Sequence, residues 1–458
     1  MVESTPVTVI GAGLAGCECA WQLARRGVPV RLLEMRPEQA TPVHKTADFA
    51  ELVCSNSLRS DHPHHAAGLL KREMERFDSL ILQAARRAAV PAGSALAVDR
   101  ESFSRAVTAA LEGEPGIAVV RQEAIELPPG DVVLATGPLT SAAMTSALSR
   151  LLGSEHLYFY DAIAPIVDGA SLDASRLFWG SRYGKGGGAD YWNAAMNREE
   201  YAVFYQALTS AEVVAPHEFE RALFFEGCLP IEELARRGVD TLRYGPMKPV
   251  GLRGPDGRRP WAVVQLRRES LSTEHFNLVG FQSRMKWGEQ KRVLGLIPGF
   301  EHAEFLRFGQ IHRNTFVNAP RHLNRFYQVA ERPSLRLAGQ ITGVEGYLES
   351  AATGLAVGLY LALERRGRQA EPLPSSTALG ALARHLTESD PEDFQPANIH
   401  YGLFWPPPEG RGRGDRRAAA AGRAHSELGA WAARNGLELT APSQTAEPLE
   451  AVPAEVPA

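Results

Sequence analysis

Cysteine is scarce in this sequence, and a long apolar run and a strong net charge are both absent from it. Four cysteines among 458 residues, without metal-site spacing, indicate a reducing cytoplasm and exclude a disulfide framework. No run of about 18 apolar residues occurs, so we expect no membrane-spanning helix and no membrane partner. The formal net charge is −4, so a polyanion has to be bound by a local basic patch.

The remaining composition is that of an ordinary soluble globular protein. Hydrophobic residues make up 44% and charged residues 22% of the chain, which is enough apolar material for a large core. The length favours about two or three domains. The apolar N-terminal segment lacks the basic residues and cleavage site of a signal peptide, so we expect it to be the first strand.

The chain is organised around a nucleotide-binding fingerprint at residues 7–16, VTVIGAGLAG. An apolar strand runs into a G-x-G-x-x-G, and a helical pattern over 14–26 follows, which is the context that a dinucleotide site requires. The first glycine allows the tight turn, the second lets the backbone approach a pyrophosphate, and the third lets the helix pack on the strand. The predicted cofactor contacts of this turn are Gly11, Ala12, Gly13, Leu14, Ala15 and Gly16.

Three later strand ends add to this site. The strand at 28–33 ends on Glu34, whose carboxylate is placed to accept hydrogen bonds from a ribose diol. The apolar run 131–138 ends in Ala-Thr-Gly, and in flavoproteins with two dinucleotide folds such a turn at Gly137 approaches the nucleotide. Without the fingerprint, a plain glycine turn explains this run equally well. After a strand from 335, the predicted contacts are Gly339, Gln340 and Gly343.

Two of the cysteines lie in unusual places. Cys54 lies in the polar, turn-rich stretch 41–65, where packing does not explain a thiol, whereas Cys17 and Cys19 lie on the first helix and are expected in the core. Cys228 precedes Pro230 and a helical pattern over 231–235, and a helix start favours a thiolate, although nearby acids oppose this. Histidines 62, 64 and 65 lack metal-site partners, so we expect a solvated loop and no metal.

The segment 236–292 carries thirteen Lys and Arg against five Asp and Glu, with five aromatic residues between them. Basic residues interleaved with aromatics suit phosphate contacts and base stacking in RNA, although a solvated basic face explains the pattern as well. The predicted RNA contacts are Arg284, Lys286, Lys291 and Arg292.

The order of the elements predicts an inserted domain. Helices are expected over 67–88, 100–111, 347–366 and 416–434, and a strand over 117–120. Short strand-like runs fill the middle of the chain, and the strand at 335 returns to the first fold. We therefore expect a discontinuous α/β domain at 1–157 and 319–436, an α+β insertion at 158–318, and a disordered tail at 437–458.

Several long motifs resemble one family closely, the folate- and FAD-dependent tRNA (uracil-5-)-methyltransferases. The last of them also resembles the longer FAD enzymes that modify the wobble uridine of tRNA. Where family members often have Asn-Cys-Pro-Met, this chain has Asn-Ala-Ala-Met at 193–196, so a third cysteine is not required. The matching stretches are GAGLAG (11–16), FAELVCSNSLRS (49–60), FFEGCLPIEELA (224–235), RYGPMKPVGL (243–252), GFQSRMKWGEQKRV (280–293), HRNTFVNAP (312–320) and AGQITGVEGYLESAATGL (338–355).

This resemblance implies a Rossmann-like FAD-binding domain of the glutathione-reductase type and methylation of carbon-5 of a T-loop uridine in tRNA. It implies 5,10-methylenetetrahydrofolate as carbon donor, FAD as the redox cofactor and NAD(P)H as reductant, with no role for DNA. Uracil carbon-5 becomes nucleophilic only after a thiolate adds at carbon-6, and a base later removes the carbon-5 proton. We assign Cys228 as the nucleophile and Cys54 as the base or a flavin-site residue.

Two other functions are alternatives to this one. A non-catalytic FAD- and RNA-binding protein would not need Cys54 or Cys228. A flavin disulfide reductase would need two cysteines close together in sequence, and no such pair exists near Cys54. The oligomeric state, the choice between NADH and NADPH, and the residues that bind folate are not predicted.

Overall fold

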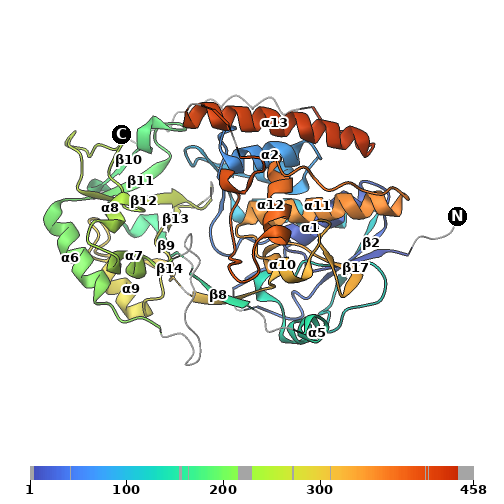
Figure 1. Ribbon diagram of the computed structural model, residues 1–458. Coiled ribbons are helices and arrows are strands. Elements are labelled where there is room, and N and C mark those ends of the chain that lie inside the picture. The colour runs from blue at the N-terminus through green and yellow to red at the C-terminus, as the bar shows by residue number, and fades with distance from the viewer. Residues whose placement is uncertain are drawn as a thin grey trace.

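The computed structural model describes residues 5–41, 43–153, 157–162, 164–214, 229–270, 273–309, 311–407, 409–410 and 412–441. They form two lobes (Figure 1). The larger lobe contains both ends of the described chain, and the smaller lobe is built from the middle of the sequence. The predicted domain bounds stay a prediction.

The larger lobe is built on a six-stranded sheet in the order β16-β17-β7-β1-β2-β6. All neighbours are parallel except β16 and β17, and Val7 to Ile10 pair in register with Val30 to Leu33. The strands are β1 (Val7–Ile10), β2 (Val30–Glu34), β6 (Ile117–Arg121), β7 (Val132–Leu134), β16 (Gln328–Val329) and β17 (Arg332–Leu337). Ligands bind such sheets beyond the carboxyl ends of the strands, where the order reverses on either side of β1.

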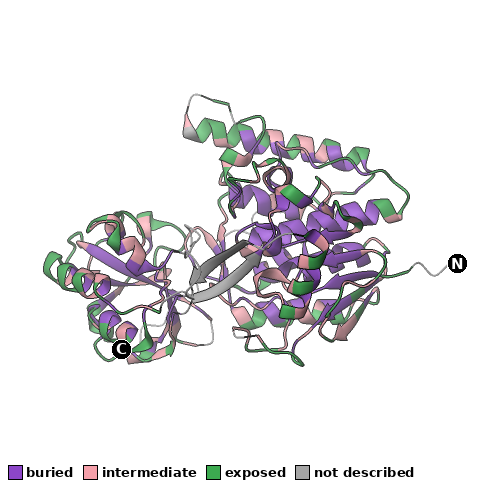
Figure 2. Cartoon of the chain, turned by 60° about the horizontal axis from the view of Figure 1, so that its bottom comes forward, coloured by how far each residue is buried: buried purple, intermediate pink, exposed green. Residues whose placement is uncertain are grey.

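Two helices pack closely beside this edge. Helix α1 (Leu14–Ala24) follows β1, and α11 (Tyr347–Arg365) packs against it. A Cβ added at Gly354 would lie 2.1 Å from the Ala15 carbonyl oxygen, so only glycine allows this approach. Figure 2 shows that buried residues are concentrated in this sheet and in the helices around it.

The other helices of the larger lobe include one correction to the sequence prediction. The helix expected over 67–88 is two helices, because Asp78 has a φ of 60° and the Ser79 hydroxyl caps a new start by accepting the Leu82 N–H at 3.3 Å. The helices are α2 (Ala66–Glu75), α3 (Leu80–Arg87), α4 (Arg100–Glu112), α5 (Ala142–Leu152), α10 (Ala319–His322), α12 (Ala378–Glu388) and α13 (Arg413–Arg434). A three-stranded sheet, β3 (Ser57–Ser60), β5 (Ala95–Val98) and β4 (Ala89–Val90), occupies part of what was expected to be loop.

The end of the described chain folds back on the larger lobe. Leu437 is buried, and the Thr440 N–H donates to the Arg76 carbonyl at 2.9 Å. The tail predicted to begin at 437 is therefore packed at its start, and residues 442–458 lie outside the described residues.

The smaller lobe is an antiparallel sheet in the order β10-β11-β12-β13-β9-β14, with short helices beside it. The antiparallel ribbon of β8 (Leu157–Ala162) and β15 (Ile311–Phe316) lies where the chain leaves and re-enters the larger lobe. The elements are β9 (Ile166–Asp168), β10 (Leu177–Trp179), β11 (Tyr191–Met196), β12 (Ala262–Arg268), β13 (His275–Leu278), β14 (Phe305–Arg307), α6 (Arg198–Thr209), α7 (Ile231–Arg236), α8 (Thr241–Tyr244) and α9 (Trp287–Leu294).

Candidate active site

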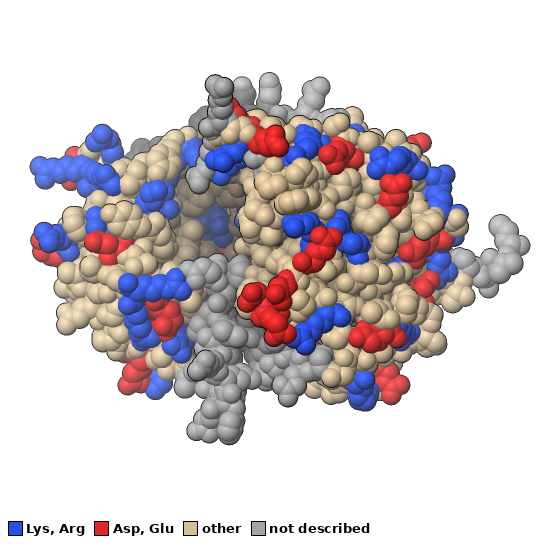
Figure 3. Space-filling view, in the orientation of Figure 1, with Lys and Arg blue, Asp and Glu red and all other residues tan. Residues whose placement is uncertain are grey.

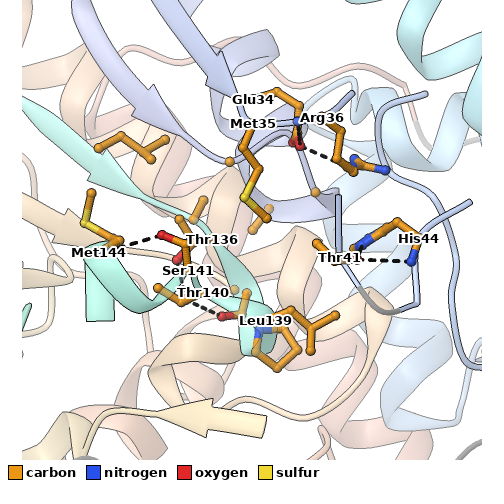
Figure 4. A pocket seen from close by; sticks show the side chains of 18 of the residues that line it. Glu34, Met35, Arg36, Thr41, His44, Thr136, Leu139, Thr140, Ser141 and Met144 are labelled. Atoms are coloured by element: carbon orange, nitrogen blue, oxygen red, sulfur yellow. Dashed lines mark hydrogen bonds and ion pairs between the residues drawn. The ribbon is translucent and has the colours of Figure 1, made fainter. Parts of the chain in front are cut away.

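A large cavity lies at the carboxyl ends of β1, β2 and β7 (Figure 4). Its volume is about 1040 Å³ with its open mouth included, which is at the upper end of the usual range for ligand pockets. Eight of the predicted cofactor residues line it. They are Gly11, Gly13, Leu14, Ala15, Glu34, Gly137, Gly339 and Gln340.

The glycines of this site have two roles: some leave space beside the cavity, and others allow close packing behind it. A Cβ added at Gly13 would meet no atom within 4 Å, so this backbone is open to the cavity. A Cβ at Gly16 would lie 1.8 Å from the Gly11 carbonyl oxygen, and one at Gly343 would lie 2.5 Å from the ring of Phe394. Gly16, Gly343 and the buried Ala12 are not lining residues, so these three support the site from behind.

Glu34 is held rigidly at the end of β2. One carboxylate oxygen accepts the Ala12 N–H at 2.9 Å, and the other accepts the Arg36 backbone N–H at 3.0 Å and its Nε–H at 2.9 Å. Burial raises the pKa of Glu34, but the charge and hydrogen bonds of Arg36 outweigh burial, and the net pKa is lowered. The carboxylate therefore stays ionised, and its remaining lone pairs can accept ribose hydroxyls.

The stretch 41–65, expected from the sequence to lie over the cofactor, lines the same end of the cavity, although Thr41, His44 and Glu51 were not predicted as contacts. Arg36 also donates to Glu51 at 3.2 Å, and Glu51 accepts the Lys45 N–H at 2.9 Å. His44, with its Nδ1 2.6 Å from the Thr41 hydroxyl, lines the cavity. Burial, helped by the charge of Arg36, lowers the pKa of His44 to about 4, so its imidazole is neutral near pH 7.

Cys54 lies beside this cavity. Its N–H donates to the hydroxyl of Tyr347 at 2.6 Å, and both Tyr347 and the adjacent Val53 are lining residues. Cys54 is partly exposed, in contrast to the buried Cys17 and Cys19. Burial raises the pKa of Cys17 and of Cys19, which keeps both as thiols and agrees with a core role.

Arginines from both lobes surround the Cys54 backbone. The Cys54 carbonyl accepts hydrogen bonds from Arg100 at 3.1 Å and from Arg307 at 3.2 Å. Arg307, at the end of β14, also donates to the Val53 carbonyl at 3.1 Å, and Arg100 forms an ion pair with Glu269. The loop that carries Cys54 is therefore fixed by residues of the smaller lobe as well as the larger one.

A third arginine, Arg267 on β12, is buried in the same region. Burial lowers the pKa of Arg267 and of Arg307. Arg267 is only 6% exposed. This corrects its place in the predicted RNA-facing basic set, because a buried side chain is not available to RNA.

Cys228 lies outside the described residues, so its proximity to Cys54 stays a prediction. The helix after it begins at Ile231, whose N–H donates to the Gln282 carbonyl at 2.7 Å, and Pro230 is its N-cap. Pro230, whose residue type suits the first position of a helix, is therefore the residue before that position, and the helix begins one residue later than predicted.

The four predicted RNA contacts lie on and beside α9. Arg284 pairs with Glu233, Lys286 with Glu212 at 2.6 Å, and Arg292 with Glu289 at 2.7 Å, while Lys291 is exposed. Glu212 and Glu233 lie outside the basic segment in the sequence, so the local charge excess is smaller than the count over 236–292 suggests. The exposed Trp287 stacks on Phe308 beside them, with ring centroids 5.8 Å apart.

Two negative findings concern the described part of the chain alone. It contains no group of three or more His, Cys, Asp or Glu side chains that could hold a metal ion. None of its helices has the length and apolar character needed to cross a membrane.

Comparison with solved structures identifies the fold. Aquifex aeolicus GidA matches with a TM-score of 0.64 in one crystal form, at 14% identity, over 92% of this chain and 76% of that one. A second crystal form matches with a TM-score of 0.62 over 93% of this chain and 74% of that one, at 15% identity. These matches confirm the predicted α/β fold of the FAD-binding type.

Comparison with curated proteins identifies the family. The Methylenetetrahydrofolate--tRNA-(uracil-5-)-methyltransferase TrmFO of Symbiobacterium thermophilum is 56% identical over 433 residues, which cover 93% of this chain and 97% of that protein. The proteins of the same name from Moorella thermoacetica and Myxococcus xanthus are 56% and 53% identical, over 92% and 94% of this chain and 97% and 95% of their own lengths. A family model described as Glucose inhibited division protein A matches residues 6–369. The chain therefore belongs to the Glucose inhibited division protein A family and, within it, to the methylenetetrahydrofolate--tRNA-(uracil-5-)-methyltransferases of the TrmFO type.

Proposed function

We propose that the protein methylates carbon-5 of a T-loop uridine in tRNA, with 5,10-methylenetetrahydrofolate as carbon donor, FAD as cofactor and NAD(P)H as reductant. The names of its relatives supply the reaction, the carbon donor and tRNA as substrate. The observation that carries the proposal is the juxtaposition of Cys54 with the fingerprint cavity through Tyr347. We place the reaction in the cytoplasm and expect neither membrane nor DNA as a partner.

The residues of the cavity fit FAD. The backbone at Gly13 is open to the cavity, and no side chain caps the start of α1 there, so the helix N-terminus is available to a pyrophosphate. Glu34 is ionised at the end of β2, where the ribose of a dinucleotide is bound in this fold. When bound and reduced by NAD(P)H, the flavin would supply the two electrons by which a methylene carbon becomes a methyl group.

The two cysteines supply the covalent and acid–base chemistry. A thiolate of Cys228 adds to carbon-6 of the uracil, which makes carbon-5 nucleophilic toward the methylene carbon. Cys54 removes the carbon-5 proton as the bond between the methylene carbon and tetrahydrofolate breaks, and tetrahydrofolate leaves. Transfer of a hydride to that carbon then expels the Cys228 thiolate and restores the double bond between carbon-5 and carbon-6. Arg100 and Arg307 hold the Cys54 backbone through its carbonyl oxygen.

The activity is tested by mass analysis of nucleosides. Purified protein is incubated with a tRNA transcript, 5,10-methylenetetrahydrofolate and NAD(P)H, and we expect 5-methyluridine. A transcript in which the T-loop uridine is replaced by cytidine should give none. Modification of the wobble uridine, or binding of FAD and tRNA without any modification, would contradict the proposal.

The roles of the cysteines are tested with RNA that carries 5-fluorouridine at the target, because fluorine replaces the proton that the base removes. Cys228→Ala should lose the covalent protein–RNA adduct. Cys54→Ala should lose turnover and keep the adduct. Loss of the adduct in Cys54→Ala alone would reverse the two assignments.

A further inference from the structure

A second cavity is lined in part by β3, the strand that follows Cys54 in the sequence. It is bordered by β3, the start of α2, the segment 399–402 and the start of α13, and encloses about 1330 Å³ with its open mouth included. The side chains that give it its character are Arg59, His65, His400, Tyr401, Arg416 and Arg417. None of the described residues that line it is an Asp or a Glu.

The cationic groups of the cavity come from different parts of the chain. Arg59 lies on β3 and forms an ion pair with Glu349, which is fully buried beneath it. Arg416 and Arg417 lie near the start of α13 and line the same cavity. Arg59, five positions after Cys54, therefore pairs with a buried carboxylate, and two further arginines line the same cavity.

A helix N-terminus adds to this positive character. Helix α2 has ten residues, its N-cap is His65, and neither a side-chain cap nor an acidic residue occupies its first turn. His65 Nδ1 lies 2.7 Å from the Ser60 hydroxyl, and the Tyr401 hydroxyl donates to the His64 carbonyl at 3.1 Å. The N-terminus is therefore fixed in position, and such a terminus favours a bound anion.

Positive charge around the cavity disfavours protonation of its two histidines. Burial lowers the pKa of His65, and the charges of His62, Arg417 and Lys185 lower it further. Burial and the charge of Arg59 lower the pKa of His400. An anion bound among these groups would offset this positive charge.

The cavity also lies near the space between the lobes. Lys185 belongs to the glycine-rich turn 184–188 of the smaller lobe, and its positive charge lowers the pKa of His65. Figure 3 shows a hollow between the two lobes, with basic side chains inside it and along its edge. A polyanion bound in this hollow would therefore meet positive groups.

We propose that this second cavity binds phosphate groups of the tRNA backbone and so holds the nucleic acid while its target uridine reaches Cys54. The proposal rests on the proposed function for the identity of the nucleic acid. Its chemistry, a phosphate held by arginines and a helix N-terminus, is also that of a phosphate on a nicotinamide dinucleotide, and the experiment separates these two sources.

The test compares Arg416→Ala/Arg417→Ala with the wild-type holoenzyme and with the control Arg434→Ala. Arg434 lies at the other end of α13 and forms an exposed ion pair with Glu371 at 2.9 Å. At about 0.1 M salt, the double variant should bind tRNA about ten-fold more weakly, and the slope of log K against log salt should fall by about one unit for each lost contact. KM for tRNA should rise while kcat at saturating tRNA is unchanged.

The outcomes are distinguishable. Wild-type affinity and salt slope in the double variant would overturn the proposal, and so would a raised KM for NADPH with unchanged tRNA affinity. If the wild-type protein binds tRNA but does not methylate it, the proposed function fails, whereas the cavity is still supported when the double variant alone loses salt-dependent binding.

Discussion

The N–H of Cys54 donates a hydrogen bond of 2.6 Å to the hydroxyl of Tyr347, the first residue of α11. These residues are 293 positions apart in the sequence. Because Tyr347 lines the nucleotide cavity, this contact fixes the Cys54 segment at the edge of that cavity.

Gly13→Glu should abolish FAD binding and leave the protein folded. A Cβ at Gly13 meets no atom within 4 Å, so the new side chain is accommodated but places a carboxylate where the pyrophosphate binds. Absorbance near 450 nm should therefore be lost, while the far-UV circular dichroism is unchanged. Gly422→Glu, at an exposed position on α13 with equally open surroundings, is the control and should stay yellow. A yellow Gly13→Glu protein would contradict the assignment of the cavity.

Arg307→Ala should lower the rate of methylation with little change in FAD content. Arg307 holds the carbonyls of Val53 and Cys54, and displacement of a reacting group by about 1 Å can cost roughly 100-fold in rate. Arg307→Lys should rescue only part of the rate, since an ammonium lacks the fork that reaches both carbonyls. Arg321→Ala, at an exposed ion pair with Glu392, serves as the control. Equal rates in Arg307→Ala and Arg321→Ala would show that this arginine does not position Cys54.

Lys286 and Glu212 should have opposite effects on tRNA binding. They form an exposed ion pair of 2.6 Å, and solvent screens such a pair so strongly that it contributes little to stability. Lys286→Ala should lower the salt slope of tRNA binding by about one unit, whereas Glu212→Gln should strengthen binding because it releases the ammonium to a phosphate. Thermal unfolding should be unaffected in both variants. Identical tRNA affinities in the two variants would show that this patch is a solvated basic face and does not contact RNA.

Glu73 should make stability fall as pH rises through the neutral range. Its buried carboxyl group accepts the N–H groups of Ala378 and Leu379 at 2.7 and 2.9 Å, and burial raises its pKa from 4.5 to about 8. Between these two values the folded state binds a proton that the unfolded state lacks, so the free energy of unfolding falls with pH, by up to about 1.4 kcal/mol per unit.

This contribution of Glu73 is measured by urea unfolding at pH 5, 6 and 7. Glu73→Gln should be less stable at pH 5 and should lack this part of the pH slope. Parallel slopes in the two proteins would show that Glu73 does not hold its proton.

The nucleotide half of the site could be predicted from the sequence because its signals are local. The spacing of Gly11, Gly13 and Gly16 follows from one turn, and Glu34 is read from the end of the next strand. The position of the loop 41–65 over the cofactor could also be predicted, but the contacts of Arg36 and His44 could not, because a buried charge pair leaves no periodic pattern.

The surroundings of Cys54 could not be predicted in the same way. Arg100, Glu269 and Arg307 come from both lobes and meet only after the sheets have formed, and a single arginine in a polar stretch carries no signal of burial. Arg267 was counted with the exposed basic residues for this reason. The break at Asp78 was missed because Ser79 starts a new helix within an apolar pattern that continues without interruption.

The most direct test of the proposed reaction is the origin of the methyl carbon. In one reaction the methylene carbon of 5,10-methylenetetrahydrofolate is labelled, in a second the methyl group of S-adenosylmethionine is labelled, and 5-methyluridine from the tRNA is isolated from each. The cavity built around Gly13 and Glu34 fits a redox cofactor and lies beside the Cys54 segment, and such a cofactor is needed only when the transferred carbon must be reduced. We predict label from the folate alone and only with NAD(P)H or another reductant present, whereas label from S-adenosylmethionine, or methylation without a reductant, would contradict this mechanism.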